Sequence, residues 1–259
     1  MRFPFRLSAG LFKAKLSGFF AGASAAPPIF RFNPCVTHLA VPLRFNETST
    51  TELEWHSPAE CAARVRSIAS PVVWIGGAEP LLHAEIGAAA DAIVETNRFA
   101  FVHTSGYNLR QRIHELRPDS RLFLTLEFAG REEAHNKTVG RPDAFRLSME
   151  AIRAAKLSGF LVAAHVTVTR ETDACDIGEL IEFLDNKDVD GFVVTSGGQL
   201  AAEKDSALQQ AVEESRTMIR CGRWERFSKL LDASFAEVSA ETSRQKFRST
   251  GEGAFEEGD

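Results

Sequence analysis

Short apolar runs alternate with segments of helical periodicity along most of the chain. Six of the runs are predicted to be strands, at residues 29–32, 71–75, 99–103, 121–128, 161–169 and 191–196. Between them, apolar residues recur at helical spacing, as Phe145, Met149 and Ile152 do. Strands and helices that alternate in this way predict right-handed crossover connections and a parallel sheet.

The number and the character of the strands narrow the architecture. Continuous apolar runs are typical of a sheet that has helices on one face and is closed or curled on the other. Six units are too few for a complete eight-unit barrel. The pattern therefore predicts an α/β fold that is either an open partial barrel or a doubly wound sheet. In both folds, ligands bind at the carboxyl ends of the strands.

Local signals mark where helices begin. Ser57 and Glu60 have the spacing of a capping box, with Pro58 at the first helical position, so a helix is predicted to begin there. The second strand runs into Gly-Gly-Ala-Glu-Pro at residues 76–80, and the apolar spacing that follows predicts a helix from Pro80. Glycines at such a junction also allow the backbone to come close to a ligand.

The two ends of the chain differ from this alternating part. We expect a basic amphipathic helix over residues 1–26, the α/β domain over 27–200, a helical extension over 201–243 and a disordered tail over 244–259. The extension carries an apolar stripe of Trp224, Phe227, Leu231 and Phe235. The N-terminal helix has an apolar face of Phe5, Phe12, Leu16 and Phe19. We expect this helix to pack on the domain, the alternative being peripheral contact with a membrane surface.

Composition narrows the class of protein. Hydrophobic residues make up 44% of the chain, enough for a sizeable core, and the net charge of -5 gives no basic surplus for binding nucleic acid. Four cysteines occur, with neither metal-ligand nor redox spacing: Cys35, Cys61, Cys175 and Cys221. They are too few for a disulfide-rich secreted fold, and Lys13 and Lys15 interrupt the apolar core that a signal peptide needs. We therefore expect a protein of the reducing cytoplasm.

Two segments resemble one known superfamily. Residues 71–86, PVVWIGGAEPLLHAEI, resemble the second strand and turn of radical S-adenosylmethionine (SAM) enzymes. Residues 135–169 are similar to the fourth helix and fifth strand of the same superfamily. Within it, the chain most resembles the hopanoid-biosynthesis branch, of the adenosylhopane synthase type. The resemblance implies a six-unit partial barrel that binds SAM at the glycine turn.

The resemblance also implies which residues contact the cofactor. In the superfamily the glycine turn approaches the methionine part of SAM. The corresponding candidates for cofactor binding are Gly76, Gly77, Glu79, Thr104, Ser105, Glu127 and His165. We expect Glu79, Thr104, Glu127 and His165 to surround one cleft, because the carboxyl ends of parallel strands meet at one edge.

The cluster motif of the superfamily is not found in this sequence. Its enzymes hold a 4Fe–4S cluster on three thiolates, spaced Cys-x3-Cys-x2-Cys, after the first strand. Aligned on Pro34, the chain has His38, Pro42 and Phe45 at those three positions. Proline and phenylalanine have no donor atom in their side chains. We therefore expect a degenerate member of the superfamily without a 4Fe–4S cluster. We expect no cofactor, and SAM is the alternative.

Three functions agree with such a chain. The first is a pseudoenzyme, a non-catalytic partner or regulatory subunit of an intact radical SAM enzyme, which docks through the aromatic residues of its N-terminal helix or C-terminal stripe. The second is a repurposed enzyme. In it, His103, Glu127 and His165 form a two-histidine, one-carboxylate metal site, or Glu127 acts as a buried acid with a raised pKa. The third is binding of SAM, or of another small molecule, without cleavage.

Overall fold

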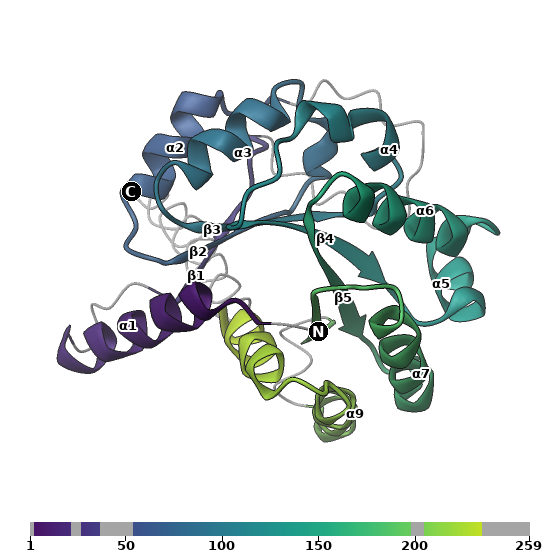
Figure 1. Cartoon of the computed structure of the whole chain (residues 1–259). Coiled ribbons are helices and arrows are strands. Elements are labelled where there is room, and N and C mark those ends of the chain that lie inside the picture. Colours follow the sequence, from purple (N-terminus) through teal and green to yellow (C-terminus); the bar gives the residue numbers. More distant parts are fainter. Residues whose placement is uncertain (1–2, 22–26, 37–53, 198–204, 235–259) are drawn as a thin grey trace, which may run out of the picture.

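The architecture is a curled, parallel half-barrel. The computed structural model describes residues 3–21, 27–36, 54–197 and 205–234, with side chains in the first helix as far as residue 15. The six strands are β1 (Ile29–Phe32), β2 (Val72–Ile75), β3 (Phe99–Thr104), β4 (Leu122–Phe128), β5 (Leu161–Val168) and β6 (Gly191–Ser196). They lie side by side in chain order (Figure 1). The partial barrel is therefore confirmed, and the doubly wound alternative, which would reverse the strand order, is wrong.

Helices cover both sides of this sheet. They are α1 (Phe5–Ala21), α2 (Pro58–Arg66), α3 (Ile86–Val94), α4 (Leu109–Arg112), α5 (Glu132–Val139), α6 (Ala144–Leu157), α7 (Ala174–Asp185) and α9 (Ser206–Thr217). Short 3-10 helices occupy Pro80–Leu82 and Ile113–Glu115. A C-terminal helix, residues 222–234, lies between α1 and α9 on the inner side of the curled sheet (Figure 1). The predicted disordered tail lies outside the described residues.

The helix predicted to begin at Pro80 begins later. The carboxylate of Glu79 accepts a hydrogen bond from the Leu81 N–H, and a single 3-10 turn follows. At His83 the backbone becomes extended, and its ring accepts a hydrogen bond from the Glu85 N–H at 2.9 Å. Because these side chains interrupt the helical pattern, α3 starts only after Glu85. The capping box at the start of α2 is confirmed.

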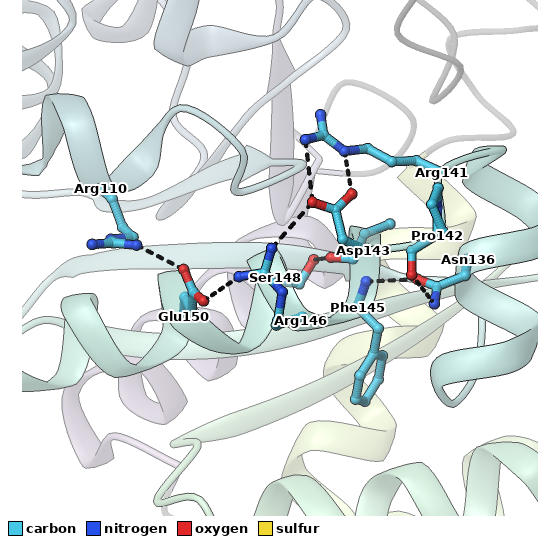
Figure 2. Close-up of polar contacts among 10 residues, drawn as sticks. Arg110, Asn136, Arg141, Pro142, Asp143, Phe145, Arg146, Ser148 and Glu150 are labelled. Carbon is cyan, nitrogen blue, oxygen red and sulfur yellow. Dashed lines mark hydrogen bonds and ion pairs between the residues drawn. The ribbon is translucent and has the colours of Figure 1, made fainter.

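The turn between α5 and α6 is held by one asparagine, as Figure 2 shows. The Asn136 side-chain amide donates to the Pro142 carbonyl at 2.8 Å, and its Oδ1 accepts from the Phe145 N–H at 2.9 Å. Gly140 ends α5 in the left-handed conformation, at φ 77°. The sequence analysis did not predict α5, because its eight residues are mostly polar and bury only His135 and Val139.

Aromatic rings fill the lower part of the barrel interior, toward the amino-terminal ends of the strands. Phe101 and Phe123 on neighbouring strands stack with ring centroids 4.6 Å apart. Trp224 and Phe227 of the C-terminal helix pack against them. Gly191 leaves the room for this contact, because a Cβ there would lie 2.2 Å from the Trp224 ring. The C-terminal helix is thus a plug of the barrel interior.

This plug removes one candidate interface. Trp224, Phe227 and Leu231 are all fully buried within the chain. Phe235, the last member of the predicted stripe, lies outside the described residues. The three described residues of the stripe are therefore not exposed and cannot contact a partner in this conformation.

The C-terminal helices also cover the free edge of β6. The backbone N–H groups of Val194 and Ser196 donate to Ser228 Oγ and Asp232 Oδ1, both at 3.0 Å. Arg216 of α9 donates to the Val194 carbonyl at 3.2 Å and to Asp232 Oδ2 at 2.6 Å. An exposed strand edge is a site for unwanted pairing, and side-chain hydrogen bonds satisfy this one.

Helix α1 packs on the domain through a face other than the predicted one. Leu7 is fully buried and Leu11 packs against the core. Phe5 and Phe12 lie about half a turn away and are 79% and 64% exposed. The prediction that the Phe5 and Phe12 face packs on the domain is therefore wrong, while Leu16 and Phe19 have no described side chains. No helix among the described residues is long and apolar enough to cross a bilayer.

Candidate functional site

The glycine turn after β2 requires glycine at one position. Gly77 has φ 102°, and a Cβ there would lie 2.9 Å from Asn33 Cγ. Asn33 Oδ1 accepts hydrogen bonds from the Cys35 N–H at 3.0 Å and the Ala78 N–H at 3.4 Å, so it joins the end of β1 to the turn. A Cβ on Gly76 would make only ordinary contacts, and Ala78 does not have a positive φ.

We predict that Gly77→Ala lowers the free energy of unfolding by about 2 kcal/mol, because the side chain is strained at this φ and collides with Asn33. Gly76→Ala is the matched control and should cost less than about 1 kcal/mol. Urea denaturation of both variants measures the difference. Equal losses would contradict the geometry of the turn.

Glu79 connects the glycine turn to the end of β3. Its Oε1 accepts from Thr104 Oγ1 at 2.7 Å, and its Oε2 accepts from the Ser105 N–H and Oγ at 2.9 and 2.8 Å. Oε1 also accepts from the Leu81 N–H at 3.1 Å. Three of the predicted cofactor-binding residues thus bind one another, and both carboxylate oxygens are engaged within the chain.

Two histidines and a carboxylate meet at the ends of β3, β4 and β5. His165 Nδ1 and His103 Nε2 lie 3.0 Å apart, and His103 Nε2 lies 3.5 Å from Glu127 Oε2. The other nitrogen of His165 contacts Thr195 Oγ1 on β6 at 2.8 Å. The strand register places Glu127 directly beside His165. We call His103, Glu127 and His165 the strand-end triad.

Burial controls the charge of the strand-end triad. It lowers the pKa of His103 to about 4, and the nearby positive charge of Arg31 acts in the same direction. Burial, then His103 and then Arg31, hold the pKa of His165 well below its ordinary value. Burial also raises the pKa of Glu127 to about 7, and the charge of Glu79 adds to this rise. A raised pKa is the direction expected of Glu127 as a buried acid, and burial favours the neutral form of both histidines.

A buried hydroxyl beside the strand-end triad has no partner. Thr125 is fully buried, and among the described residues its Oγ1 makes no hydrogen bond. The register puts Thr125 opposite His103, and it lies two residues before Glu127 on the same face of β4. Most buried hydroxyls in folded proteins are hydrogen-bonded, so this one marks a place for a water or ligand atom.

We predict that Thr125→Val raises the free energy of unfolding of the ligand-free chain by about 1 kcal/mol, because it removes an unpaired buried hydroxyl without changing shape. Thr104→Val is the matched control. It removes the hydrogen bond to Glu79 and should lower the same quantity by about 1 kcal/mol. A loss of stability in both variants would mean that the Thr125 hydroxyl is satisfied.

The predicted site residues form two adjoining groups. Glu79, Thr104 and Ser105 form one, and the strand-end triad forms the other. Glu127 and His165 face the barrel interior and not the helix layer, since they share a sheet face with Phe123. The sequence analysis missed Asn33, Thr125 and Thr195. The place of the two threonines depends on the register between the strands, which the apolar runs do not reveal.

The cysteines do not form a cluster site. Cys61 lies in α2, where its thiol donates to the His56 carbonyl at 3.6 Å and burial raises its pKa to about 11. Cys35 is buried after β1, while Cys175 lies on α7 and Cys221 precedes the C-terminal helix. Among the described residues, the only group with metal-ligand geometry is the strand-end triad, which contains no thiolate. These donors do not fit a 4Fe–4S cluster. His38, Pro42 and Phe45 lie outside the described residues.

Solved structures of SuiB share the fold of this chain. The chain is similar to SuiB of Streptococcus suis bound to S-adenosylmethionine, with 16% identity and a TM-score of 0.54, over 80% of this chain and 48% of SuiB. SuiB bound to its precursor peptide SuiA gives 15% identity and a TM-score of 0.55, over 80% of this chain and 50% of SuiB.

At this identity the likeness shows the fold alone, and the chain spans about half the length of SuiB. No curated protein matches the sequence. A family model described as the radical SAM superfamily matches residues 40–184, more than half of the 259 residues. This chain belongs to the radical SAM superfamily.

Proposed function

We propose that this chain is a cluster-free member of its superfamily that binds a small molecule at the carboxyl ends of its strands. The observation that carries the proposal is the convergence of His103, Glu127 and His165 inside the barrel. Toward the amino-terminal ends of the strands, aromatic rings fill the same interior. Burial of ionisable groups costs stability, so folded chains keep such groups mainly where function needs them. The side chains of His103 and Glu127 remain 20% and 12% exposed, so a ligand can reach them from solvent.

S-adenosylmethionine is the ligand to test first. SuiB, which shares the fold, was crystallised with it. The glycine turn at the end of β2, where the superfamily binds the methionine part of SAM, is retained around Gly77. Without three suitably spaced thiolates there is no 4Fe–4S cluster in this proposal, and SAM is bound without reductive cleavage.

We also propose that the chain is related to the hopanoid-biosynthesis branch of the superfamily. Similarity at residues 71–86 and 135–169 supports this assignment. Gly77 and Asn136, which lie in these segments, shape turns of the scaffold. The similarity therefore supports common descent and gives no reason to expect the same substrate. Four cysteines in a chain of 259 residues are too few for a disulfide-rich fold, which supports a reducing compartment such as the cytoplasm.

Calorimetric titration with SAM at about pH 8, above the pKa of Glu127 of about 7, tests the proposed binding. The parent should release heat on binding, and Glu127→Gln should bind at least tenfold more weakly, because a nearby carboxylate favours the cationic groups of SAM. Glu150→Gln on the outer surface of α6 is the control and should bind like the parent. Absence of heat with the parent, or equal affinity of the parent and Glu127→Gln, would refute SAM binding at these strand ends.

A second candidate function is supported by the exposed side of α1. Phe5 and Phe12 lie on it at 79% and 64% exposure, and such aromatic surface is typical of interfaces. This supports a non-catalytic partner or regulatory subunit of an intact radical SAM enzyme. Co-purification from the native organism tests it, with the double variant Phe5→Ser, Phe12→Ser as control. An intact Cys-x3-Cys-x2-Cys protein should accompany only the parent.

Two other results would rule out the partner role, one in that co-purification and one in a vesicle-binding assay. One is a monomeric parent without companions. The other is binding of the parent, and not the double variant, to vesicles with anionic lipid, which would assign α1 to a membrane surface. Arg6, Lys13 and Lys15 make the helix basic and compatible with this outcome.

A further inference from the structure

We propose that the strand-end triad of His103, Glu127 and His165 binds a divalent transition-metal ion, Zn²⁺ or Fe²⁺. The inference rests on the proposed binding role of the strand ends and names an ion that would complete the site. Two neutral histidines and one carboxylate form the ligand set of mononuclear non-haem iron sites and of catalytic zinc sites. Three protein ligands leave coordination positions open for water or a small molecule.

The distances suit one shared ion. Zinc binds imidazole nitrogen and carboxylate oxygen at about 2.0–2.2 Å, so two ligands of one ion lie roughly 3.0–3.4 Å apart. His103 Nε2 and His165 Nδ1 are already 3.0 Å apart, and Glu127 Oε2 is 3.5 Å from His103 Nε2. The three donor atoms all lie within 4.8 Å of one another. For both atoms to bind one ion, the distance of 3.5 Å between His103 Nε2 and Glu127 Oε2 has to shorten slightly.

The surroundings orient the ligands. Metal-bound histidines usually bond through their second nitrogen to a neighbouring group, and His165 Nε2 has this contact with Thr195 Oγ1 at 2.8 Å. The Trp74 ring lies 5.2 Å from the His103 ring and 5.3 Å from the His165 ring, and forms an apolar wall. The unpaired hydroxyl of Thr125 is an independent sign of a missing water or ligand atom beside the site.

One neighbour opposes cation binding. Arg31 lies close enough to lower the pKa of both histidines by its positive charge. The carboxylates of Glu127 and Glu79 lie close enough to each other to interact, and they supply the opposite charge. The 3.0 Å contact between the histidines is also an acceptable hydrogen bond without metal. Metal titration separates these two possibilities.

The test uses the full chain, freed of metal by chelation and titrated with Zn²⁺ in a calorimeter and with Co²⁺ by visible absorbance. The parent should bind both ions stoichiometrically. His103→Gln should abolish binding, and Thr195→Val, which removes the hydroxyl that contacts His165 Nε2, should weaken it roughly 10–100-fold. His135→Gln is the control, since it changes a buried histidine outside the triad and should bind like the parent. Circular dichroism verifies that each variant is folded.

Lack of stoichiometric binding by the parent, or equal binding by the parent, His103→Gln and Thr195→Val, would overturn the metal site. Calorimetry with SAM on the chelated parent keeps the two proposals apart. If SAM binds and the metal ions do not, only the metal site is overturned. If the ions bind and SAM does not, the metal site stands and SAM is removed as the ligand.

Discussion

Replacement of Trp224 by alanine should lower the free energy of unfolding by about 4 kcal/mol, the largest effect we expect from one substitution. The indole is fully buried, and its Nε1 donates to the Asp190 carbonyl at 3.1 Å. Its ring contacts four others, those of Phe3, Phe101, Phe123 and Phe227. The variant would leave a large cavity in the barrel interior.

Urea denaturation measures this loss, with Phe12→Ala as the control. Phe12 is 64% exposed on α1, so its removal should change the free energy of unfolding by less than about 0.5 kcal/mol. A loss below about 1 kcal/mol for Trp224→Ala would mean that the C-terminal helix does not fill the barrel.

Arg216→Ala should lower the free energy of unfolding by about 3 kcal/mol, because it leaves Asp232 partly buried without its cation. Arg216 is 6% exposed and Asp232 is 19% exposed, and their contact at 2.6 Å fixes the free edge of β6. Arg146→Ala is the matched control. It breaks the exposed pair with Glu150 (Figure 2) and should cost less than about 1 kcal/mol. Equal losses in urea denaturation would contradict this account of the edge.

The sheet could be predicted from sequence because parallel strands buried on both faces appear as unbroken apolar runs. All six strands occur within a residue or two of the predicted positions. The start of α3 could not be predicted in this way. In the sequence, Glu79 and Pro80 resemble the start of a helix. The Glu79 side chain is held by Thr104 and Ser105, which lie about 25 residues further along the chain.

Apolar periodicity also does not reveal which side of a helix is covered. Trp224 and Phe12 both lie on apolar helical faces, yet one is fully buried and the other is exposed. The difference arises because α1 packs through Leu7, on the opposite face from Phe12. Contacts with elements distant in sequence decide which side of a helix is buried. The apolar pattern within one helix does not contain this information.

The strand-end triad could be predicted because the ends of adjacent parallel strands must converge, whatever the loops do. His103, Glu127 and His165 were found by that rule. Thr195 and Thr125 were not, because their place depends on the register between strands, which places Thr195 beside Thr167 and Thr125 beside Ala163. A polar residue inside an apolar run gives little sign of this from sequence alone.

Anaerobic reconstitution with iron and sulfide tests most directly the claim that the superfamily fold is kept here without its cluster. We expect a colourless protein that contains no acid-labile sulfide, since no three thiolates come together among the described residues. Iron without sulfide would agree with the strand-end triad as a metal site. A stoichiometric iron–sulfur cluster that is lost in the Cys35→Ser and Cys61→Ser variants would contradict the account.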